Sequence, residues 1–274
     1  MNSSNGDRAF SGSIAQLYEQ YLVPLIFDPY AKDLTNRLAS LHPSAVLEIA
    51  AGTGVVTRYM AAQLPADVSI VATDLNQPML DHAMNIGTSR SVTWQQVDAM
   101  SLPFGDGTFD AVVCQFGAMF FPEKAAAFAD ARRVLRPGGT FLFNVWDRIE
   151  DNEFAECVTQ AMASLFPTDP PRFLARLPHG YYDQMAISAA IAQGGFTGAN
   201  VFDIVTAQSA AESPRMAAIA YCQGTPLRNE IETRDASILG KATDIATAAI
   251  GQLFGVGRIT GKTQAIVIAA TRNA

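Results

Sequence analysis

The chain has 274 residues, of which 49% are hydrophobic and 16% charged, and its formal net charge is −7. This length allows one large domain with a substantial core. The acidic balance disfavours a nucleic-acid partner, because it would repel a phosphate backbone. No membrane insertion is expected, since every apolar run is shorter than the roughly 18 residues of a membrane span. The polar segment 1–8 lacks a signal-peptide core, so the cytoplasm is the expected location.

The N-terminal part is predicted to be helical over residues 12–40, with Pro24 in the first turn of the second helix of this segment. From residue 45, strands and helices alternate, which predicts a parallel sheet with helices on both faces. The predicted strands are 45–50, 68–73, 92–97, 109–115 and 138–146, and the predicted helices between them are 55–64, 77–86 and 123–135.

After residue 146 this alternation stops. The predicted elements are a helix at 150–166, a proline-rich loop at 167–181, a helix at 183–193, a strand at 199–206, a mostly helical segment at 211–256 and a last strand at 263–270. We interpret the helical material on either side of the strand at 199–206 as a cap over one end of the sheet rather than a second domain.

A glycine turn gives the first functional indication. Val46 to Ile49 is a short apolar strand, and the turn that follows it, up to Gly54, has almost no side chains. Such a turn lets a ligand lie against the backbone. Asp74 ends the next apolar run, where doubly wound folds place a carboxylate on ribose hydroxyls. The two features together predict a nucleoside cofactor.

The same turn bears on which nucleoside it binds. A nicotinamide-binding turn has three glycines in the order Gly-x-Gly-x-x-Gly, and the third is missing after Gly52 and Gly54. Glu48 lies inside the strand end, where an acid disfavours a pyrophosphate and suits a cationic ligand. These residues favour a cationic nucleoside ligand, and a nicotinamide oxidoreductase is the competing hypothesis.

The turn and four later segments resemble the motifs of class I S-adenosylmethionine-dependent methyltransferases. The five segments are 48–54, 72–80, 96–104, 109–117 and 132–139. The match runs from about residue 44 to residue 146 in the order and spacing of the family. It is closest to the small-molecule branch that includes the ubiquinone/menaquinone-type methyltransferases (methyltransferase type 11). Ala50 departs from the family, which often has glycine there.

The resemblance implies an α/β fold: a Rossmann-like, seven-stranded, mostly parallel sheet with helices on both faces, an antiparallel last strand and a helical cap. It implies a single methyltransferase domain over residues 1–274. The implied parts are N-terminal helices covering the site (1–43), a cofactor-binding core (44–147), cap insertions (148–182 and 207–261) and the end of the sheet (183–206 and 262–274).

The resemblance also implies the cofactor, S-adenosyl-L-methionine, which leaves as S-adenosyl-L-homocysteine. Glu48 would lie near the amino-acid end of this cofactor, and Asp74 would accept hydrogen bonds from both ribose hydroxyls. Asp98 would bond the adenine amino group, although a simple turn role is the alternative. The remaining implied contacts on this side are the backbone of Ala50, Gly52 and Gly54 along the ligand, and Leu75, Met79 and Ala99 around the adenine.

At the other end of the cofactor, Gln115 and Phe116 would flank the methyl-bearing sulfur. Tyr18 and Tyr21 would close over the ligand, with packing in the core as the alternative for both. His179 is the only histidine in the loop expected to face the site, and histidine is the natural general base near neutral pH. It is therefore the candidate catalytic residue.

Two absences narrow the expected reaction. No carboxylate cluster lies near the fourth strand, so no metal is expected. The Asn/Asp-Pro-Pro-Tyr motif of amide- or base-directed enzymes is replaced by residues 115–118, Gln-Phe-Gly-Ala. The expected reaction is metal-free in-line methyl transfer to O, C or N of a small, partly apolar acceptor, by a monomer or homodimer. The alternative is a chain that binds the cofactor or its product without catalysis, as a regulator or assembly partner.

Overall fold

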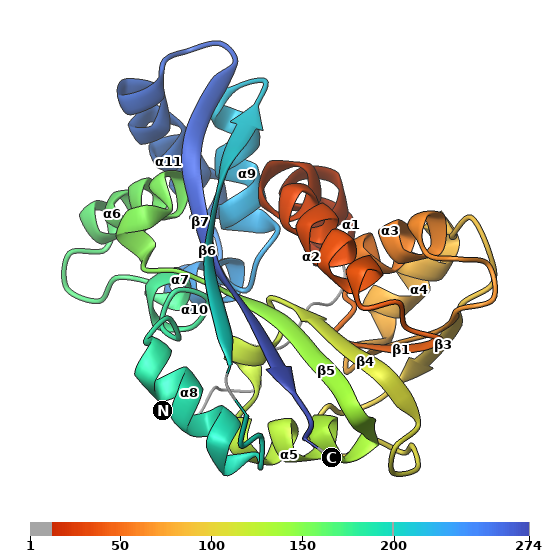
Figure 1. The fold of residues 1–274 in the computed structure, drawn as a ribbon. Coiled ribbons are helices and arrows are strands. Elements are labelled where there is room, and N and C mark those ends of the chain that lie inside the picture. Colours follow the sequence, from red (N-terminus) through yellow and green to blue (C-terminus); the bar gives the residue numbers. More distant parts are fainter. Residues whose placement is uncertain (1–12, 199, 274) are drawn as a thin grey trace. The chain divides into compact units, whose positions relative to one another are not determined.

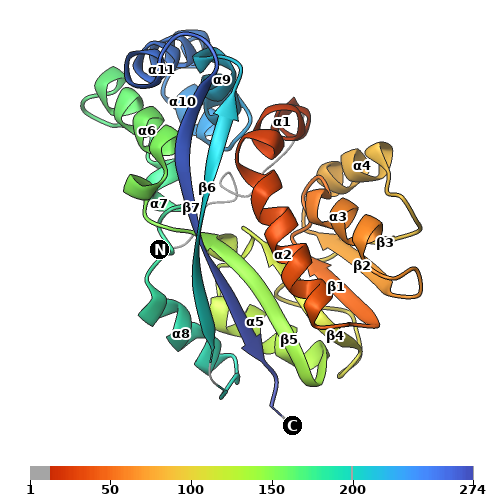
Figure 2. The same ribbon diagram turned by 45° about the horizontal axis from the view of Figure 1, so that its top comes forward.

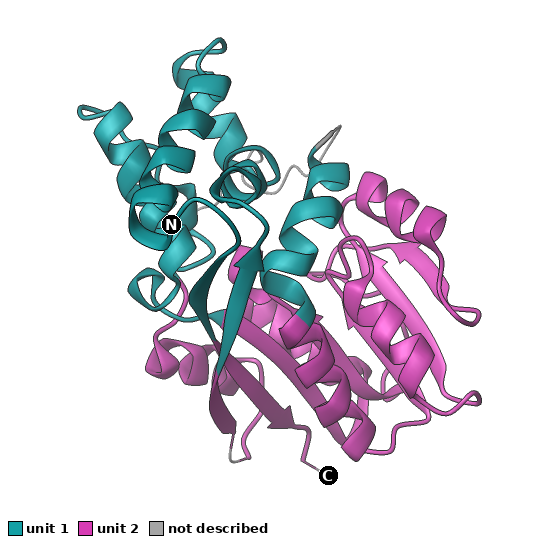
Figure 3. Cartoon of the chain, turned by 90° about the horizontal axis from the view of Figure 1, so that it is seen from above, with its two compact units in different colours: residues 1–28, 146–180, 206–264 teal, residues 29–145, 181–205, 265–274 magenta. Residues whose placement is uncertain are grey.

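The computed structural model describes residues 13–198 and 200–273 (Figure 1). Residues 12 and 199, which begin two of the predicted elements, lie outside this part of the chain. The chain forms two compact units (Figure 3). The first contains residues up to Asp28, Trp146–Gly180 and Thr206–Gln264, and the second contains Pro29–Val145, Tyr181–Val205 and the residues from Ala265 onward.

One seven-stranded sheet has the order β3-β2-β1-β4-β5-β7-β6. Its strands are β1 (Ala45–Ile49), β2 (Ser69–Asp74), β3 (Thr93–Gln96), β4 (Phe109–Gln115), β5 (Leu135–Trp146), β6 (Val201–Ala211) and β7 (Ile259–Thr271). The pairs β1–β2, β2–β3, β1–β4 and β4–β5 are all parallel. The boundary between the units falls within β6 and β7 and one residue before the end of β5.

The last strand runs in the opposite direction to its neighbour β5. The N–H of Arg272 donates to the carbonyl of Gly139 (2.8 Å). Further along, the N–H of Asp147 donates to the carbonyl of Gln264 (3.1 Å). Residue numbers rise along β5 as they fall along β7, so these two strands are antiparallel. The predicted α/β fold with a mostly parallel sheet and an antiparallel last strand is confirmed.

The second unit has helices on both faces of the sheet. Its helices are α2 (Asp28–Ser40, from Pro29 on), α3 (Val55–Gln63), α4 (Gln77–Ile86), η3 (Ala118–Phe120), α5 (Lys124–Val134) and α8 (Gln184–Gln193). On one side of β1 the sheet continues with β2 and then β3, and on its other side it continues with β4 and then β5. Because such crossovers are right-handed, α3 and α4 cover one face and α5 covers the other.

The face under α5 contains an aromatic cluster. Phe141 and Phe143 alternate along β5 and therefore point to the same side of the sheet. Their rings stack with centroids 4.6 Å apart, and Phe128 of α5 packs on both, at 5.4 and 5.3 Å. All three side chains are fully buried. This core holds the carboxyl end of β5 in place beside β4.

The first unit contains the remaining described helices. These are α1 (Ser13–Leu17), the π-helix η2 (Tyr18–Phe27), η4 (Ile149–Asp151), α6 (Glu153–Leu165), α7 (Phe173–Arg176), α9 (Pro214–Gln223), α10 (Leu227–Arg234) and α11 (Leu239–Phe254). Helix α11 packs against α9 and α6, as Figure 2 shows, and α9 also contacts η2. Among the helices of the described chain, none is long and apolar enough to span a membrane.

Three local predictions were wrong. Pro24 lies inside η2 and does not begin a helix, and η2 joins α1 to α2 without a break. Proline clashes with the carbonyl four residues earlier in an α-helix, and the wider π-turn relieves that clash. The predicted loop 167–181 contains α7. The strand predicted at 138–146 begins earlier, at Leu135, which was predicted to end a helix and instead pairs with Phe109 of β4.

Candidate functional site

Strand order reverses between β1 and β4, and ligands in open α/β sheets bind outside the carboxyl ends of the strands at such a switch point. The turn after β1 lies at this place. Ala50, Gly52 and Gly54 have φ of 56°, 57° and 82°, in the left-handed region. A Cβ on Gly54 would come within 2.8 Å of the Trp94 ring and 3.1 Å of the Ala83 Cβ, so only glycine fits there. The turn has few side chains because Gly52 and Gly54 adopt a left-handed backbone conformation that favours glycine.

Asp74 ends β2 and holds this turn. Its side chain is buried, and its Oδ2 accepts the N–H of Gly52 at 2.8 Å. Its Oδ1 accepts the N–H of Asn76 at 2.8 Å. Burial raises the pKa of Asp74, and these N–H donors act in the opposite direction by stabilising the charged form. The predicted ribose ligand Asp74 and the predicted turn residue Gly52 are therefore in direct contact.

Glu48 supplies a second buried carboxylate at the end of β1. Only 1% of the residue is exposed, and its Oε2 accepts the hydroxyl hydrogen of Thr57, in the first turn of α3. Burial, together with the nearby charge of Asp74, raises the pKa of Glu48 to about 8. Two acids beside a bare turn form a site that favours a cation, because a positive charge would stabilise the ionised form of both.

The predicted adenine side lies at the ends of β2 and β3. Leu75 is 41% exposed, and its carbonyl accepts from the Gln96 side chain at 2.8 Å. Asp98 is exposed and its Oδ1 accepts the N–H of Met100 at 2.9 Å, which is the turn role named above as the alternative. Met79 is buried in α4. The structure thus brings Asp74, Leu75 and the start of the segment after β3 together.

At the end of β4, Phe116 has φ of 50°, also left-handed. Its N–H donates to Oδ1 of Asn144 at 2.9 Å, and its ring meets Tyr30 edge-on at 5.3 Å. A Cβ on Gly117 would lie only 2.5 Å from the Cβ of Ala50. The turn after β4 and the turn after β1 are therefore in contact, with Ala50 as the meeting point.

The sequence did not predict a cluster of contacts that holds the segment after β4. The ammonium of Lys124 donates to the carbonyls of Met119 (3.2 Å) and Phe121 (2.9 Å) and lies 4.6 Å from the ring centre of Tyr181. Burial lowers the pKa of Lys124 and raises that of Tyr181. No pattern in the sequence indicated this cluster, because Tyr181 joins it from a distant part of the chain.

The first unit contains the other predicted residues: Tyr18, Tyr21 and His179. The ring of Tyr18 stacks on Phe27 at 4.9 Å, Phe27 lies 5.9 Å from Trp146, and Trp146 lies 5.8 Å from His179. These rings form an aromatic row within that unit. Tyr21 is partly exposed. The predicted roles of Tyr18 and Tyr21 at the cofactor stay predictions.

His179 is buried, with 5% exposed, and its Nδ1 lies 2.9 Å from the carbonyl oxygen of Asp147. Because that oxygen only accepts, Nδ1 carries the proton. Burial lowers the pKa of His179 to about 4. The ring is therefore neutral at pH 7 with Nε2 as its basic atom, and its role as a general base stays a prediction.

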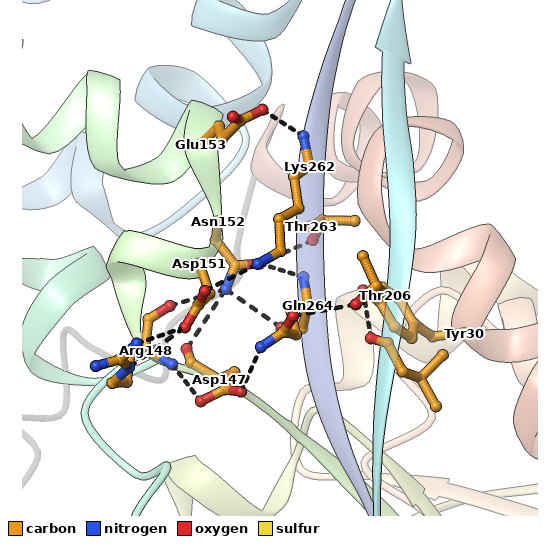
Figure 4. Close-up of polar contacts among 11 residues, drawn as sticks. Tyr30, Asp147, Arg148, Asp151, Asn152, Glu153, Thr206, Lys262, Thr263 and Gln264 are labelled. Atoms are coloured by element: carbon orange, nitrogen blue, oxygen red, sulfur yellow. Dashed lines mark hydrogen bonds and ion pairs between the residues drawn. The ribbon is translucent and has the colours of Figure 1, made fainter.

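A polar network fixes the segment that holds His179 (Figure 4). Oδ2 of Asp147 accepts from the Gln264 side chain at 2.8 Å, and Oε1 of Gln264 accepts from Thr206 at 3.0 Å. Oδ1 of Asn152 accepts from Thr263 (2.8 Å) and from the N–H of Gln264 (3.0 Å). Asp147 is thereby tied to β6 and β7 within the first unit. Among the described residues there is no cluster of three or more His, Cys, Asp or Glu that could hold a metal ion.

Comparison with known proteins gives consistent matches. A methyltransferase-domain family model matches residues 46–139. The ubiquinone/menaquinone biosynthesis C-methyltransferase of Pseudomonas aeruginosa is 31% identical over 164 residues, which cover 55% of this chain and 64% of that protein. The chain therefore spans less than two thirds of that relative's length.

Two further matches extend this result. The malonyl-[acyl-carrier protein] O-methyltransferase of Geobacter sulfurreducens is 32% identical over 187 residues, which cover 65% of this chain and 68% of that protein. A crystal structure of a candidate methyltransferase from Bacillus halodurans has a TM-score of 0.57 at 18% identity, covering 89% of this chain and 99% of its own. That structural match concerns the fold alone.

Proposed function

The chain belongs to the class I S-adenosylmethionine-dependent methyltransferase family, and on this premise we propose that it transfers a methyl group to an oxygen, carbon or nitrogen of a small, partly apolar acceptor. One observation carries the proposal. The bare turn Ala50–Gly54 lies at the switch point of the sheet beside two buried carboxylates, Glu48 and Asp74. This site suits a nucleoside that carries positive charge.

The residues present fit S-adenosylmethionine, which supplies a methyl group already activated on a sulfonium. Asp74 retains lone pairs on both oxygens, so it accepts ribose hydroxyls in addition to the N–H groups that hold it. Glu48 balances an ammonium group. The exposed apolar side chain of Leu75 offers a surface for the adenine ring. A dinucleotide fits less well, since its pyrophosphate would face the two acids.

In the proposed reaction, the main task of the protein is to hold the acceptor in line behind the methyl group. Positioning of this kind contributes roughly 7–11 kcal/mol to lowering the barrier. We propose that Gln115 and Phe116 flank the reacting centre from the end of β4. Where the acceptor must lose a proton, the proposed base is Nε2 of His179, since Nδ1 faces the Asp147 carbonyl.

We further propose that the whole chain acts as one methyltransferase domain in the cytoplasm, as a monomer or homodimer. The segments 148–182 and 207–261 would select the acceptor, since they lie outside the residues matched by the family model. Size-exclusion chromatography with light scattering tests the oligomeric state, and a tetramer or larger species would contradict it.

Methyl transfer from radiolabelled S-adenosylmethionine tests the activity directly. The acceptor panel contains phenols, quinols and a malonyl thioester, because the relatives' names refer to quinone biosynthesis and to malonyl-acyl carrier protein. A labelled acceptor product is expected. Cofactor binding without transfer to any acceptor would favour a non-catalytic binding protein. Tight NADH binding with no S-adenosylmethionine binding would refute the proposal.

Asp74→Ala tests the cofactor site without an acceptor. The variant leaves ribose hydroxyls unpaired, so S-adenosylmethionine affinity should fall by about 1–3 kcal/mol. Isothermal titration calorimetry measures this loss. Asp98→Ala tests the implied adenine contact in the same way: a loss of affinity would support that contact, and unchanged affinity would support the turn role of Asp98. Unchanged affinity in Asp74→Ala would contradict the assigned role.

A further inference from the structure

Asn144, near the carboxyl end of β5, is fully buried, with 0% exposed, and polar. Its Oδ1 accepts the N–H of Phe116 at 2.9 Å. Because an N–H only donates, the oxygen must face Phe116, and the NH2 group must point elsewhere. Among the described residues, that NH2 group has no hydrogen-bond partner. An unpaired buried donor costs folding free energy, whereas an apolar side chain of similar size would not. Packing alone therefore does not explain asparagine here.

The bond to Phe116 has a specific consequence for the backbone. In the ladder of β4 and β5, Gln115 pairs with Asn144, and the next N–H belongs to Phe116. This N–H lies 3.3 Å from the carbonyl oxygen of Asn144 and 2.9 Å from its side-chain oxygen. The side chain thus competes with the strand for the same donor. Strand β4 ends here, and Phe116 turns to φ of 50°, which is unfavourable for a bulky residue.

The turn after β1 also restricts the backbone that follows Phe116. Gly117 lies so close to the methyl group of Ala50 that an added Cβ would be 2.5 Å away. The edge-on contact with Tyr30, at 5.3 Å, fixes the ring of Phe116. The segment after β4 is therefore held between Asn144, Tyr30 and Ala50. All of these residues lie in the second unit.

We propose that Asn144 is a positioning residue for methyl transfer. Its carboxamide holds Phe116 in the left-handed conformation, so that the turn after β4 meets the turn Ala50–Gly54 where the sulfur end of the donor binds. The inference rests on the proposed function, and it assigns Asn144 no contact with the donor. If Asn144 has this role, its removal should weaken only the binding of the sulfur and amino-acid end of the ligand.

The test compares two ligands that differ at that end, S-adenosylhomocysteine and adenosine, each titrated by calorimetry into the full-length protein. Asn144→Ala is expected to raise the Kd of S-adenosylhomocysteine about tenfold and to leave that of adenosine within about twofold. Asp74→Ala is the matched control. The proposed contact of Asp74 is with the ribose, which both ligands contain. Asp74→Ala should weaken both.

Two further variants separate positioning from loss of folding. Glycine adopts a left-handed φ without strain, so Phe116→Gly removes the need for Asn144. In that background, Asn144→Ala should change the Kd of S-adenosylhomocysteine by less than about twofold. Asn144→Asp retains an oxygen toward the Phe116 N–H, and full burial would favour the protonated, uncharged form of the new carboxyl group, so it should bind like the wild type. Circular dichroism confirms the fold of each variant.

Equal weakening of both ligands by Asn144→Ala would overturn the inference, as would an undiminished effect in the Phe116→Gly background. Wild-type affinity in Asn144→Ala would also overturn it while leaving the proposed function intact. If the wild type fails to bind S-adenosylhomocysteine, the proposed function is refuted, and this inference with it. The two failures are therefore distinguishable.

Discussion

Glu48 and Asp74 are both buried carboxylates, but they have different partners. Backbone N–H groups of Gly52 and Asn76 stabilise the charged form of Asp74. The Thr57 hydroxyl donates a hydrogen bond to Glu48, which stabilises the charged form. Burial has the larger effect, and it raises the pKa of Glu48 to about 8. Near neutral pH the pair therefore carries less than two negative charges in the ligand-free protein. A cationic ligand would favour ionisation of Glu48.

Glu48→Gln is expected to stabilise the ligand-free protein at alkaline pH. The pKa of Glu48 is raised on folding, so its contribution to the free energy of unfolding is fully present below its ordinary pKa of 4.5 and is lost as pH rises through about 8. From about pH 4 to pH 9 the variant should gain on the order of 4 kcal/mol relative to the wild type. Denaturant unfolding at both pH values measures the gain, and an equal pH dependence in the two proteins would contradict it.

His179→Asn is expected to reduce the acid sensitivity of the protein. Burial lowers the pKa of His179 from 6.5 to about 4, so between these values the unfolded chain binds a proton that the folded chain does not. The wild type should lose on the order of 3 kcal/mol as pH falls through this window. Asparagine keeps an N–H toward the Asp147 carbonyl but does not titrate. Urea unfolding at about pH 7 and pH 4.5 compares the two proteins.

The same variant also tests catalysis by His179. If its Nε2 is the general base, His179→Asn should lower methyl transfer by about 10²-fold or more, without weakening cofactor binding. Unchanged transfer would show that the acceptor needs no base at this position. The stability measurement above identifies any loss that comes from unfolding.

At the scale of elements, the two turns at the switch point share an unusual property. Ala50 after β1 and Phe116 after β4 both have positive φ, although neither is glycine. Such strain persists only where the surroundings impose it, and it gathers at functional sites. Asp74 at the end of β2 accepts a hydrogen bond from Gly52 in the first turn, and Asn144 on β5 accepts one from Phe116 in the second. The strain therefore comes from partners on neighbouring strands.

Gly54→Ala tests how tightly the turn after β1 is packed. Gly54 has φ of 82° and ψ of 27°, in the left-handed region, and a Cβ added there would lie 2.8 Å from the Trp94 ring. Backbone strain should cost about 1–2 kcal/mol, and overpacking should cost about 1–3 kcal/mol more. In a Trp94→Ala background the contact with the ring is gone, so the cost of Gly54→Ala should fall toward the strain alone. Thermal and urea unfolding measure the difference, and an equal cost in both backgrounds would contradict the packing argument.

At the scale of the whole molecule, the family match and the proposed cofactor residues of the turn belong to one unit. Residues 46–139 lie entirely within the second unit. The first unit contains the π-helix with Tyr18 and Tyr21, and π-helical turns are frequent at functional sites. Hydrogen exchange is suited to asking whether both units respond to the ligand, because it measures each segment separately.

S-adenosylhomocysteine is expected to slow amide hydrogen exchange over residues 46–54 and 74–79, because the proposed site would place the ligand over these backbones. If Tyr18 and Tyr21 close over the cofactor, peptides from 18–27 should be protected as well. Mass spectrometry of exchanged peptides, with and without the ligand, gives the comparison. Protection confined to the second unit would contradict the predicted roles of the two tyrosines and leave the turn assignment unaffected.

The amino-acid sequence by itself determined the features that depend on near neighbours. The alternation of strands and helices from residue 45, the bare turn up to Gly54 and the acid at Asp74 all follow from local patterns, and the sheet confirms the fold that they predicted. Gly54 adopts a positive φ that glycine favours, and a carboxylate at a strand end is recognisable from its spacing to the turn. Such signals need no knowledge of distant segments.

Only the tertiary structure decided the contacts between distant segments. Phe116 meets Asn144, Lys124 meets Tyr181, and Leu135 pairs with Phe109, so that β5 begins before its predicted start at residue 138. The burial of His179 depends on its packing against Trp146 in the same way. Each partner is far away along the chain, and the order of strands in the sheet brings the two together. A local pattern reports the period of one element, whereas the position of that element against another depends on the whole fold.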